Sequence, residues 1–299
     1  MSIVIPAYNE ARRLPATLAG WRDFLGSQAY GWEILVVDDG SADATAAVAE
    51  AAGARVVRLN PNRGKGGAVR AGVLAADGEF IAYADADMNI APSNLQEALR
   101  RLEASSTPTN STDPNLQQAV QRLESDTDPT RSRHRQNANR QDGLRRLEIE
   151  STPGESPEPH RQRARRRLED GGLADLVAGR RDLAQYAAAE GPSRLLAGAL
   201  VQATRRLVVM SEIRDTQCGF KVFRRDLGRA IFARTRVRSF AFDIEVLFLA
   251  RKLGARIVEL PVSTTYRAES TFSVRKHLPL FLKDIFQIRL NDLLGRYDQ

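Results

Sequence analysis

The sequence predicts an α/β fold in which helices flank a mostly parallel sheet. In the first hundred residues, short apolar segments of strand length alternate with longer segments that have helical spacing. The apolar segments are continuous, which is typical of parallel strands that helices cover on both faces. Unusual polar residues follow several of these segments directly, and open parallel sheets bind ligands beyond such strand ends. With 299 residues, of which 42% are hydrophobic, the chain can bury a substantial core.

Each element of this pattern has a local reason. The first expected helix carries its large apolar residues, Leu14, Leu18, Trp21 and Leu25, at helical spacing. Ser41 can cap the second helix, because a serine hydroxyl accepts a backbone N–H at a helix start. We expect strands at 2–6, 33–37, 55–59, 79–84, 173–178 and 255–262, and helices at 12–25, 42–52, 66–76, 193–209, 242–253 and 278–294.

The segment 104–168 interrupts this order. It is rich in Ser, Thr, Pro, Gln, Asn and Arg and poor in large apolar residues, so burial cannot offset its ordering entropy. An Arg-Leu-Glu unit recurs in it and at its borders, which indicates tandem expansion of a surface loop. The repeats lack the apolar residues that a solenoid would stack. We therefore expect a single domain at 1–299, interrupted by a disordered insert at 104–168.

Composition and charge narrow the classes of partner. The net charge of +7 and the pI near 9.9 suit an anionic partner, such as a nucleotide, a nucleic acid or a membrane surface. The single cysteine, Cys218, excludes an internal disulfide and a cysteine-based metal site, which fits a reducing compartment. We find no signal region before the first strand and no apolar run of spanning length. We therefore expect a soluble or peripheral protein.

Two aspartates leave the tip of the fourth expected strand two residues apart. Asp85 and Asp87 point the same way if the strand alternation continues, so they can share one divalent cation. Carboxylates suit Mg²⁺ or Mn²⁺, which complete their coordination with water and substrate phosphates. Solvated loop aspartates are the alternative for an isolated pair. Asp38 and Asp39 end the second strand similarly, although an Asp-Gly step there is also typical of a plain turn.

A glycine-rich segment at 62–67 precedes the third expected helix. Its glycines, among them Gly66, can expose backbone N–H groups to an anion at the helix start, and Lys65 can approach that anion. The segment lacks the spacing of a P-loop. A tight strand-to-helix connection explains the same glycines equally well.

The polar segments form an ordered series that resembles a known family. Four of them together are similar to the motifs of family 2 (GT-A) inverting glycosyltransferases, at residues 3–10, 37–43, 62–66 and 85–88. The string Asp-Thr-Gln-Cys-Gly-Phe-Lys at 215–221, with 242–245 and 259–262, resembles the dolichyl-phosphate β-glucosyltransferase branch. The resemblance implies a GT-A fold and inverting transfer of a hexose, first of all glucose from UDP-glucose, to a polyprenyl phosphate. The near alternative is another donor, such as GDP-mannose, or a non-lipid acceptor.

The resemblance implies a nucleotide-sugar site at the strand ends of the first half of the chain. Asp38 and Asp39 would bind the uracil edge and the ribose hydroxyls. Asp85 and Asp87 would hold Mg²⁺ or Mn²⁺ against the donor diphosphate, which is Lewis-acid catalysis. Gln217 would lie beside the metal or the sugar. The remaining expected donor contacts are Pro6, Tyr8, Glu10, Lys65 and Gly66.

A phosphate acceptor needs cations more than a strong base, because a phosphate oxygen is already an anionic nucleophile near neutral pH. Residues 179–181 match a Gly-Ser-Arg element of the family, with Arg180 where Ser is usual, and imply Arg181 at the acceptor phosphate. Arg194 and Lys221 are the further candidates for this contact.

The expected catalytic set is Asp87, Asp215 and Gln217, in which Asp215 is the candidate base if the reaction uses one. Residues 266–273 correspond to a loop that closes over the donor diphosphate in the family. Here the tryptophan and the Gly-Ser pair that are usual in that loop are replaced.

The last expected helix combines apolar and basic residues and can lie in a membrane interface, although packing on the sheet explains its apolar residues equally well. Its apolar residues are Phe281, Ile285, Phe286, Ile288 and Leu293, and its basic neighbours are Arg275, Lys276, Lys283 and Arg289. We expect a cytoplasmic protein, peripheral on the cytoplasmic face of the membrane. A rival from another class is nucleic-acid binding through the Arg-rich insert, but we expect no nucleic-acid partner.

Overall fold

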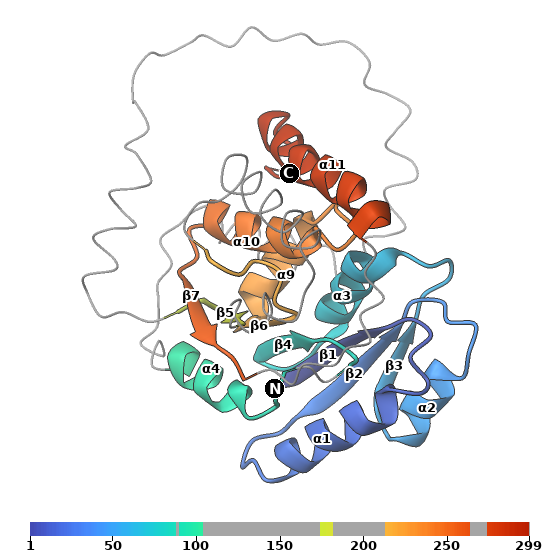
Figure 1. Ribbon diagram of the computed structural model, residues 1–299. Helices are drawn as coiled ribbons and strands as arrows, with labels where there is room; N and C mark the ends of the chain where they lie inside the picture. Colours follow the sequence, from blue (N-terminus) through green and yellow to red (C-terminus); the bar gives the residue numbers. More distant parts are fainter. Residues whose placement is uncertain (88–89, 104–173, 182–212, 264–273, 299) are drawn as a thin grey trace, which may run out of the picture. The chain divides into compact units, whose positions relative to one another are not determined.

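The computed structural model describes residues 1–87, 90–103, 174–181, 213–263 and 274–298 (Figure 1). These residues belong to one compact unit, which spans 1–109 and 173–299. Its strands form one sheet in the order β3-β2-β1-β4-β6-β5-β7. The strands are β1 (Ser2–Ala7), β2 (Glu33–Asp38), β3 (Arg55–Arg58), β4 (Phe80–Ala84), β5 (Leu176–Arg180), β6 (Phe220–Arg224) and β7 (Ile257–Pro261). The predicted insert at 104–168 lies outside the described residues.

One strand, β6, makes the sheet mixed. β1 to β4 pair in parallel and so do β5 and β7, whereas β6 runs antiparallel to both β4 and β5. The predicted mostly parallel α/β sheet is therefore confirmed. Because β6 runs the other way, its first residue, Phe220, pairs with Ala84, the last residue of β4. The segment before β6 thus reaches the same sheet edge as the residues after β4.

Helices cover the sheet on both faces (Figure 1). The described helices are α1 (Leu14–Gly26), α2 (Thr45–Ala51), α3 (Gly64–Ala75), α4 (Asn94–Glu103), α9 (Arg225–Arg234), α10 (Phe242–Lys252) and α11 (Val274–Leu293). One core takes side chains from α3, α9, α10 and α11 and from strand residues such as Val4 and Val37. A second core takes side chains from α1 and α4 and from Ile3, Ile5 and Val36. Alternate residues of one strand therefore serve opposite cores, which explains the continuous apolar strands.

Two local features differ from the prediction. Helix α2 begins at Thr45 without a side-chain cap, and the Ser41 hydroxyl instead accepts the backbone N–H of Asn9 over 2.9 Å. Helix α9 was not predicted, although Leu227, Ala230 and Ile231 are buried and have helical spacing. The expected helix at 193–209 lies outside the described residues. Strand β6 and helix α4 were likewise not among the expected elements. The described elements that were expected agree with the prediction to within about four residues at each end.

Helix α3 approaches the sheet closely at Gly72. A Cβ atom at this position would overlap the Val4 side chain and lie 2.8 Å from Cγ2 of Val37. The backbone of α3 can pack on β1 and β2 at this distance only because Gly72 has no side chain.

Replacing Gly72 by Ala is therefore expected to lower the free energy of unfolding by about 1–3 kcal/mol, the usual cost of an overpacked core. Gly26→Ala is the matched control, because a Cβ at this end of α1 has nothing within 4 Å. Urea unfolding followed by circular dichroism measures both variants. Equal stability of Gly72→Ala and the wild type would show that α3 is not packed as described.

Candidate active site

The predicted site residues gather at one edge of the sheet. Ala7 at the end of β1 pairs with Asp38 at the end of β2, and its carbonyl accepts the backbone N–H of Asp39 over 2.9 Å. The end of β4 and the start of β6 lie side by side at the same edge. Segments from both halves of the chain thus meet where open α/β sheets bind ligands.

Asp38 and Asp39 are buried, and each carboxylate accepts a hydrogen bond from a backbone N–H of a neighbouring loop. Oδ1 of Asp38 accepts the N–H of Ser41 over 3.0 Å, and Oδ1 of Asp39 accepts the N–H of Arg63 over 2.7 Å. Burial raises the pKa of Asp39, and the hydrogen bonds from the Arg63 and Gly64 backbone offset only part of this effect. The turn interpretation and the binding interpretation are therefore compatible, because a carboxylate has more lone pairs than these bonds use.

The segment after β1 forms a partly exposed wall next to these aspartates. Tyr8 is 51% exposed, and Pro6 is half-buried at the end of β1. Glu10 makes a bidentate ion pair with Arg13, with distances of 2.7 Å to Nε and 2.6 Å to Nη2. The Glu10 carboxylate therefore already has a cationic partner.

The Asp-Ala-Asp segment at 85–87 is fixed through its middle residue. Ala86 is buried in the core, and its carbonyl accepts the Thr17 hydroxyl of α1 over 2.6 Å. The Asp85 carboxylate lies directly against Gly219, where a Cβ atom would be 2.7 Å from Oδ1 and closer still to Oδ2. A glycine at 219 is thus a steric requirement for this position of Asp85.

Lys65, in the first turn of α3, is the cationic partner of Asp85. Its Nζ lies 2.6 Å from Oδ1 of Asp85, so this carboxylate has a close counter-charge. Burial works to lower the pKa of Lys65, but the carboxylates of Asp85, Asp243 and Asp87 outweigh it and raise that pKa. The ammonium is therefore charged at neutral pH.

This segment fits a divalent cation. Asp85 and Asp87 offer two carboxylates, and the Asp85 carboxylate has more lone pairs than its contact with Lys65 uses. Mg²⁺ and Mn²⁺ need only one or two protein carboxylates when substrate phosphates complete their coordination. No group of three or more His, Cys, Asp or Glu side chains that could hold a metal occurs among the described residues.

The structure corrects the expected role of Gly66. Its backbone N–H donates to the carbonyl of Arg238 over 3.0 Å and is therefore not available to an anion. A Cβ at Gly66 would lie 2.6 Å from the Val237 oxygen and 2.7 Å from Cβ of Phe242. The tight-connection interpretation holds for this glycine, because it lets α3 pack against the segment that leads into α10.

Arg181 and Asp215 form a buried bidentate ion pair at the end of β5. Nε and Nη2 of Arg181 donate to the two carboxylate oxygens over 2.8 and 3.0 Å, and the Arg181 backbone N–H adds a third bond of 3.1 Å. Burial works to raise the pKa of Asp215, but the hydrogen bonds and charge of Arg181 outweigh it and hold that pKa below its usual value. Asp215 also accepts the N–H of Gln217 over 3.1 Å. This environment makes Asp215 an anchor for Arg181 and a poor base.

Lys221 has a structural environment. It is fully buried, and its ammonium donates to the carbonyls of Thr216 and Cys218 over 3.2 and 3.0 Å and to Oδ1 of Asp243 over 2.5 Å. An ammonium has three donors, so these three acceptors use all of them. This contradicts the expected contact of Lys221 with an acceptor phosphate. Cys218 is likewise a packing residue, because burial raises the pKa of its thiol to about 12.

From the sequence we assigned no role to two acids that hold the loop before β6, at residues 214–219, in place. Asp243 on α10 accepts the hydroxyl of Tyr83 over 2.6 Å in addition to the Lys221 ammonium. Glu259 on β7 accepts the backbone N–H groups of Arg214 and Asp215 over 2.9 and 3.0 Å. The sequence did contain a signal for such residues, namely an acid inside an otherwise apolar helix or strand. Burying that acid costs free energy unless a partner is buried with it.

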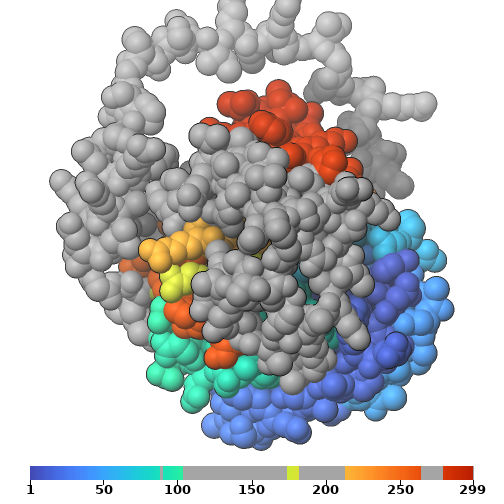
Figure 2. Space-filling model, viewed as in Figure 1, coloured from blue at the N-terminus to red at the C-terminus, as the bar shows by residue number. Residues whose placement is uncertain are grey.

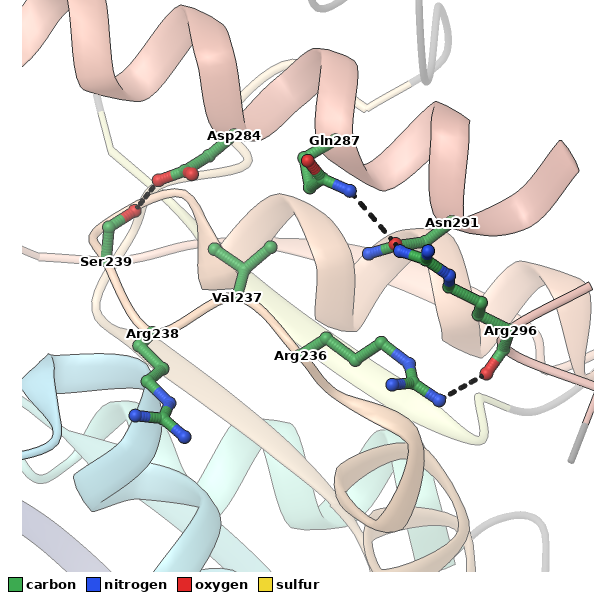
Figure 3. Close-up of a pocket in the computed structure, with 8 residues that line it drawn as sticks. All are labelled: Arg236, Val237, Arg238, Ser239, Asp284, Gln287, Asn291 and Arg296. Carbon is green, nitrogen blue, oxygen red and sulfur yellow. Dashed lines mark hydrogen bonds between the residues drawn. The ribbon is translucent and has the colours of Figure 1, made fainter. Parts of the chain in front are cut away.

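Some expected site residues lie outside the described part of the chain. Arg194 and residues 266–273 are not among the described residues. A polar pocket of about 500 Å³ between residues 236–239 and α11 is lined by none of the predicted site residues (Figure 3). Several of its polar groups pair with one another, as in the hydrogen bond of 2.9 Å from Arg236 to the carbonyl of Arg296.

Comparison with known proteins agrees with this geometry. The family model of glycosyl transferase family 2 matches residues 2–150. The dolichyl-phosphate beta-glucosyltransferases of Drosophila melanogaster and Homo sapiens are each 30% identical to this chain, over 99% of it and over 76% and 77% of their own lengths. The chain therefore belongs to glycosyl transferase family 2 and is a glycosyltransferase. Within that family, its resemblance to the dolichyl-phosphate β-glucosyltransferase branch is confirmed.

A solved structure supports the fold. Glucosyl-3-phosphoglycerate synthase from Mycobacterium tuberculosis, in complex with Mn²⁺, uridine diphosphate and glucosyl-3-phosphoglycerate, superposes with a TM-score of 0.55. The match covers 99% of this chain and 78% of that one at 17% identity. At this identity the likeness concerns the fold alone.

Replacing Lys221 by Met is expected to lower the free energy of unfolding by about 3–5 kcal/mol, because it leaves Asp243 buried without its counter-charge. The control is Lys252→Met, which removes an ammonium that pairs with Asp292 over 2.7 Å near the protein surface and should cost about 1 kcal/mol or less. Urea unfolding gives both values. Similar losses in the two variants would argue against the buried pair as a stabilising link.

Proposed function

We propose that the protein transfers glucose from UDP-glucose to a polyprenyl phosphate of the dolichyl type, with inversion at the sugar. The observation that carries this proposal is the presence of two distinct charged centres at one sheet edge, an acidic one at Asp85 and Asp87 and a cationic one at Arg181. The first suits a metal-bound diphosphate and the second suits an acceptor phosphate. The names of the curated relatives support the choice of glucose and of dolichyl phosphate.

The donor half of the proposal uses the ends of β1, β2 and β4. Asp38 and Asp39 bind the nucleoside, with Pro6, Tyr8 and Glu10 as the adjoining wall. Asp85 and Asp87 hold Mg²⁺ or Mn²⁺, and Gln217 lies beside the metal or the sugar. When bound, the cation stabilises the negative charge that develops on the departing diphosphate. The Mn²⁺ and uridine diphosphate in the mycobacterial synthase support a divalent metal and a uridine nucleotide as the ligands to test first.

In the acceptor half of the proposal, Arg181 binds the acceptor phosphate. Asp215 contributes indirectly, because it holds the Arg181 guanidinium in position. The bidentate pair holds the guanidinium plane in place, so the cation is ordered before the acceptor arrives. The low pKa of Asp215 keeps that carboxylate ionised at neutral pH. The phosphate oxygen attacks as an anion and needs no strong base. Arg194, outside the described residues, remains our second proposed contact with this phosphate.

Purified protein with a divalent metal and dolichyl phosphate is expected to form lipid-extractable product from labelled UDP-glucose, and little from labelled GDP-mannose. Asp87→Asn should lower the rate about a hundredfold or more, because a metal carboxylate is lost. The matched control is Asp77→Asn, which neutralises an exposed carboxylate just before β4, at the opposite end of that strand. Full activity of Asp87→Asn would refute the metal assignment, and a preference for GDP-mannose would refute the donor.

A lipid acceptor requires access to a membrane surface, and helix α11 offers a suitable face. Phe281, Ile285 and Ile288 are buried in the core, so these three expected interface residues serve packing instead. Phe286 and Leu293, however, are 58% and 77% exposed. Their side is extended by the exposed residues Leu280, Leu290 and Leu294 and by the cations Lys283 and Arg289.

We propose that this face of α11, a helix drawn in red in Figure 2, rests on anionic lipid on the cytoplasmic side of the membrane. Apolar side chains interleaved with cations are typical of helices that lie in the membrane interface. Among the described helices none is long and apolar enough to cross a bilayer. The rival proposal, nucleic-acid binding through the insert at 104–168, concerns residues outside the described part.

Comparing a polyprenyl phosphate in vesicles with a short, water-soluble one distinguishes the membrane contact from the phosphate contact. The double variant Phe286→Ser, Leu293→Ser is expected to bind vesicles containing anionic phospholipid about tenfold more weakly in co-sedimentation, because two exposed apolar side chains are lost. Its activity on a short, water-soluble polyprenyl phosphate should be unchanged. Arg181→Lys should raise KM for both acceptors, because a lysine cannot form the bidentate pair with Asp215.

Trp32→Ser is the control, since Trp32 is partly exposed just before β2, away from α11. Vesicle binding of the double variant equal to that of the wild type would exclude α11 as the membrane contact. An effect of Arg181→Lys on the vesicle acceptor alone would exclude Arg181 as a phosphate ligand.

A further inference from the structure

The ion pair between Lys65 and Asp85 lies inside the proposed metal site. The side chains are 21% and 33% exposed, so solvent screens this contact less than it screens a surface pair. Nζ of Lys65 is 5.9 Å from the ring centroids of both Phe240 and Phe242. The rings limit where the ammonium can go, and Gly219 limits where the Asp85 carboxylate can go.

Two cations therefore compete for the Asp85 carboxylate. Its Oδ1 lies 2.6 Å from the Lys65 ammonium, and in the proposed function the same carboxylate binds the divalent cation. An ammonium and a divalent cation on the same carboxylate repel each other, and the repulsion is strong where water is partly excluded. Lys65 must give up Asp85, at least in part, when this carboxylate binds a divalent ion.

We propose that Lys65 is a competing cation for Asp85 and that it couples metal binding to donor binding; the donor half of this inference rests on the proposed function. In the metal-free protein the Lys65 ammonium neutralises Asp85. On metal loading that ammonium is released beside the same site, where a dianionic diphosphate is its natural partner. Lys65 is thus a positioning residue that opposes the metal alone and favours the metal together with the donor.

A count of charges gives the sign of this coupling. Asp85 and Asp87 with Lys65 carry one net negative charge, so a divalent ion alone leaves the site positive. The dianionic diphosphate then returns it to a net negative charge that the surrounding cations can balance. Without Lys65, the two carboxylates and a divalent ion are already neutral, so the metal gains affinity and the diphosphate loses it. By linkage, whatever UDP does to the affinity for metal, the metal does to the affinity for UDP.

The test measures Mn²⁺ binding directly by electron paramagnetic resonance, with and without UDP, in the wild type and in K65M. K65M is expected to bind Mn²⁺ alone about tenfold more tightly, the factor for losing one partly buried competing ion pair. UDP should strengthen Mn²⁺ binding several-fold more in the wild type than in K65M. K252M is the matched control and should behave as the wild type, since Lys252 lies at the far end of α10 from Phe242, about 15 Å along the helix.

Mn²⁺ binding by K65M that is equal to or weaker than that of the wild type overturns the proposal. Tighter binding by K65M with no effect of UDP on either protein upholds the competition and refutes the donor assignment, so the two failures are distinguishable. K65Q, which keeps a polar side chain of similar length, provides the same measurement if thermal melting shows that K65M does not fold.

Discussion

The active-site edge depends on the buried ion pair between Lys221 and Asp243. It links β6 to α10 underneath Tyr83 of β4, and the same ammonium binds two carbonyls of the loop at 215–219. A lysine without water is tolerated here because each of its donors has an acceptor. The pair thereby helps to determine the path of this loop. It presents Gly219 to Asp85 and Asp215 to Arg181.

Two carboxylates at this edge already have a cationic partner within the chain. Asp85 pairs with Lys65, and Asp215 pairs with Arg181. The two pairs differ in geometry, because the Lys65 ammonium contacts one oxygen of Asp85 whereas Arg181 binds both oxygens of Asp215. A single contact to an ammonium constrains the two groups less than a bidentate pair, which holds its arginine in one place. This difference matches the two tasks that we propose, a replaceable partner at the metal and a fixed cation at the acceptor.

Several features were predictable because they depend on local sequence. Apolar strands that alternate with helices indicated the parallel sheet, and the aspartates at 38–39 and 85–87 were expected at the strand ends where they are found. Other predictions failed because a distant segment intervened. The role of Gly66 depends on the approach of residues 237–242, and that of Lys221 on β6 depends on Asp243 of helix α10. Three apolar residues of α11 pack in the core. Helix α9 was missed although its apolar spacing was visible.

The sequence by itself determined the class of fold, the family and the positions along the chain where polar chemistry occurs. These follow from periodicity and from short motifs, which need no knowledge of distant contacts. Only the tertiary structure decided which charges are partners. The antiparallel strand β6 brings residues 215–221 back to the tip of β4, more than a hundred residues away in sequence. An ion pair depends on distance in space and on the exclusion of water, and neither can be read from spacing along the chain.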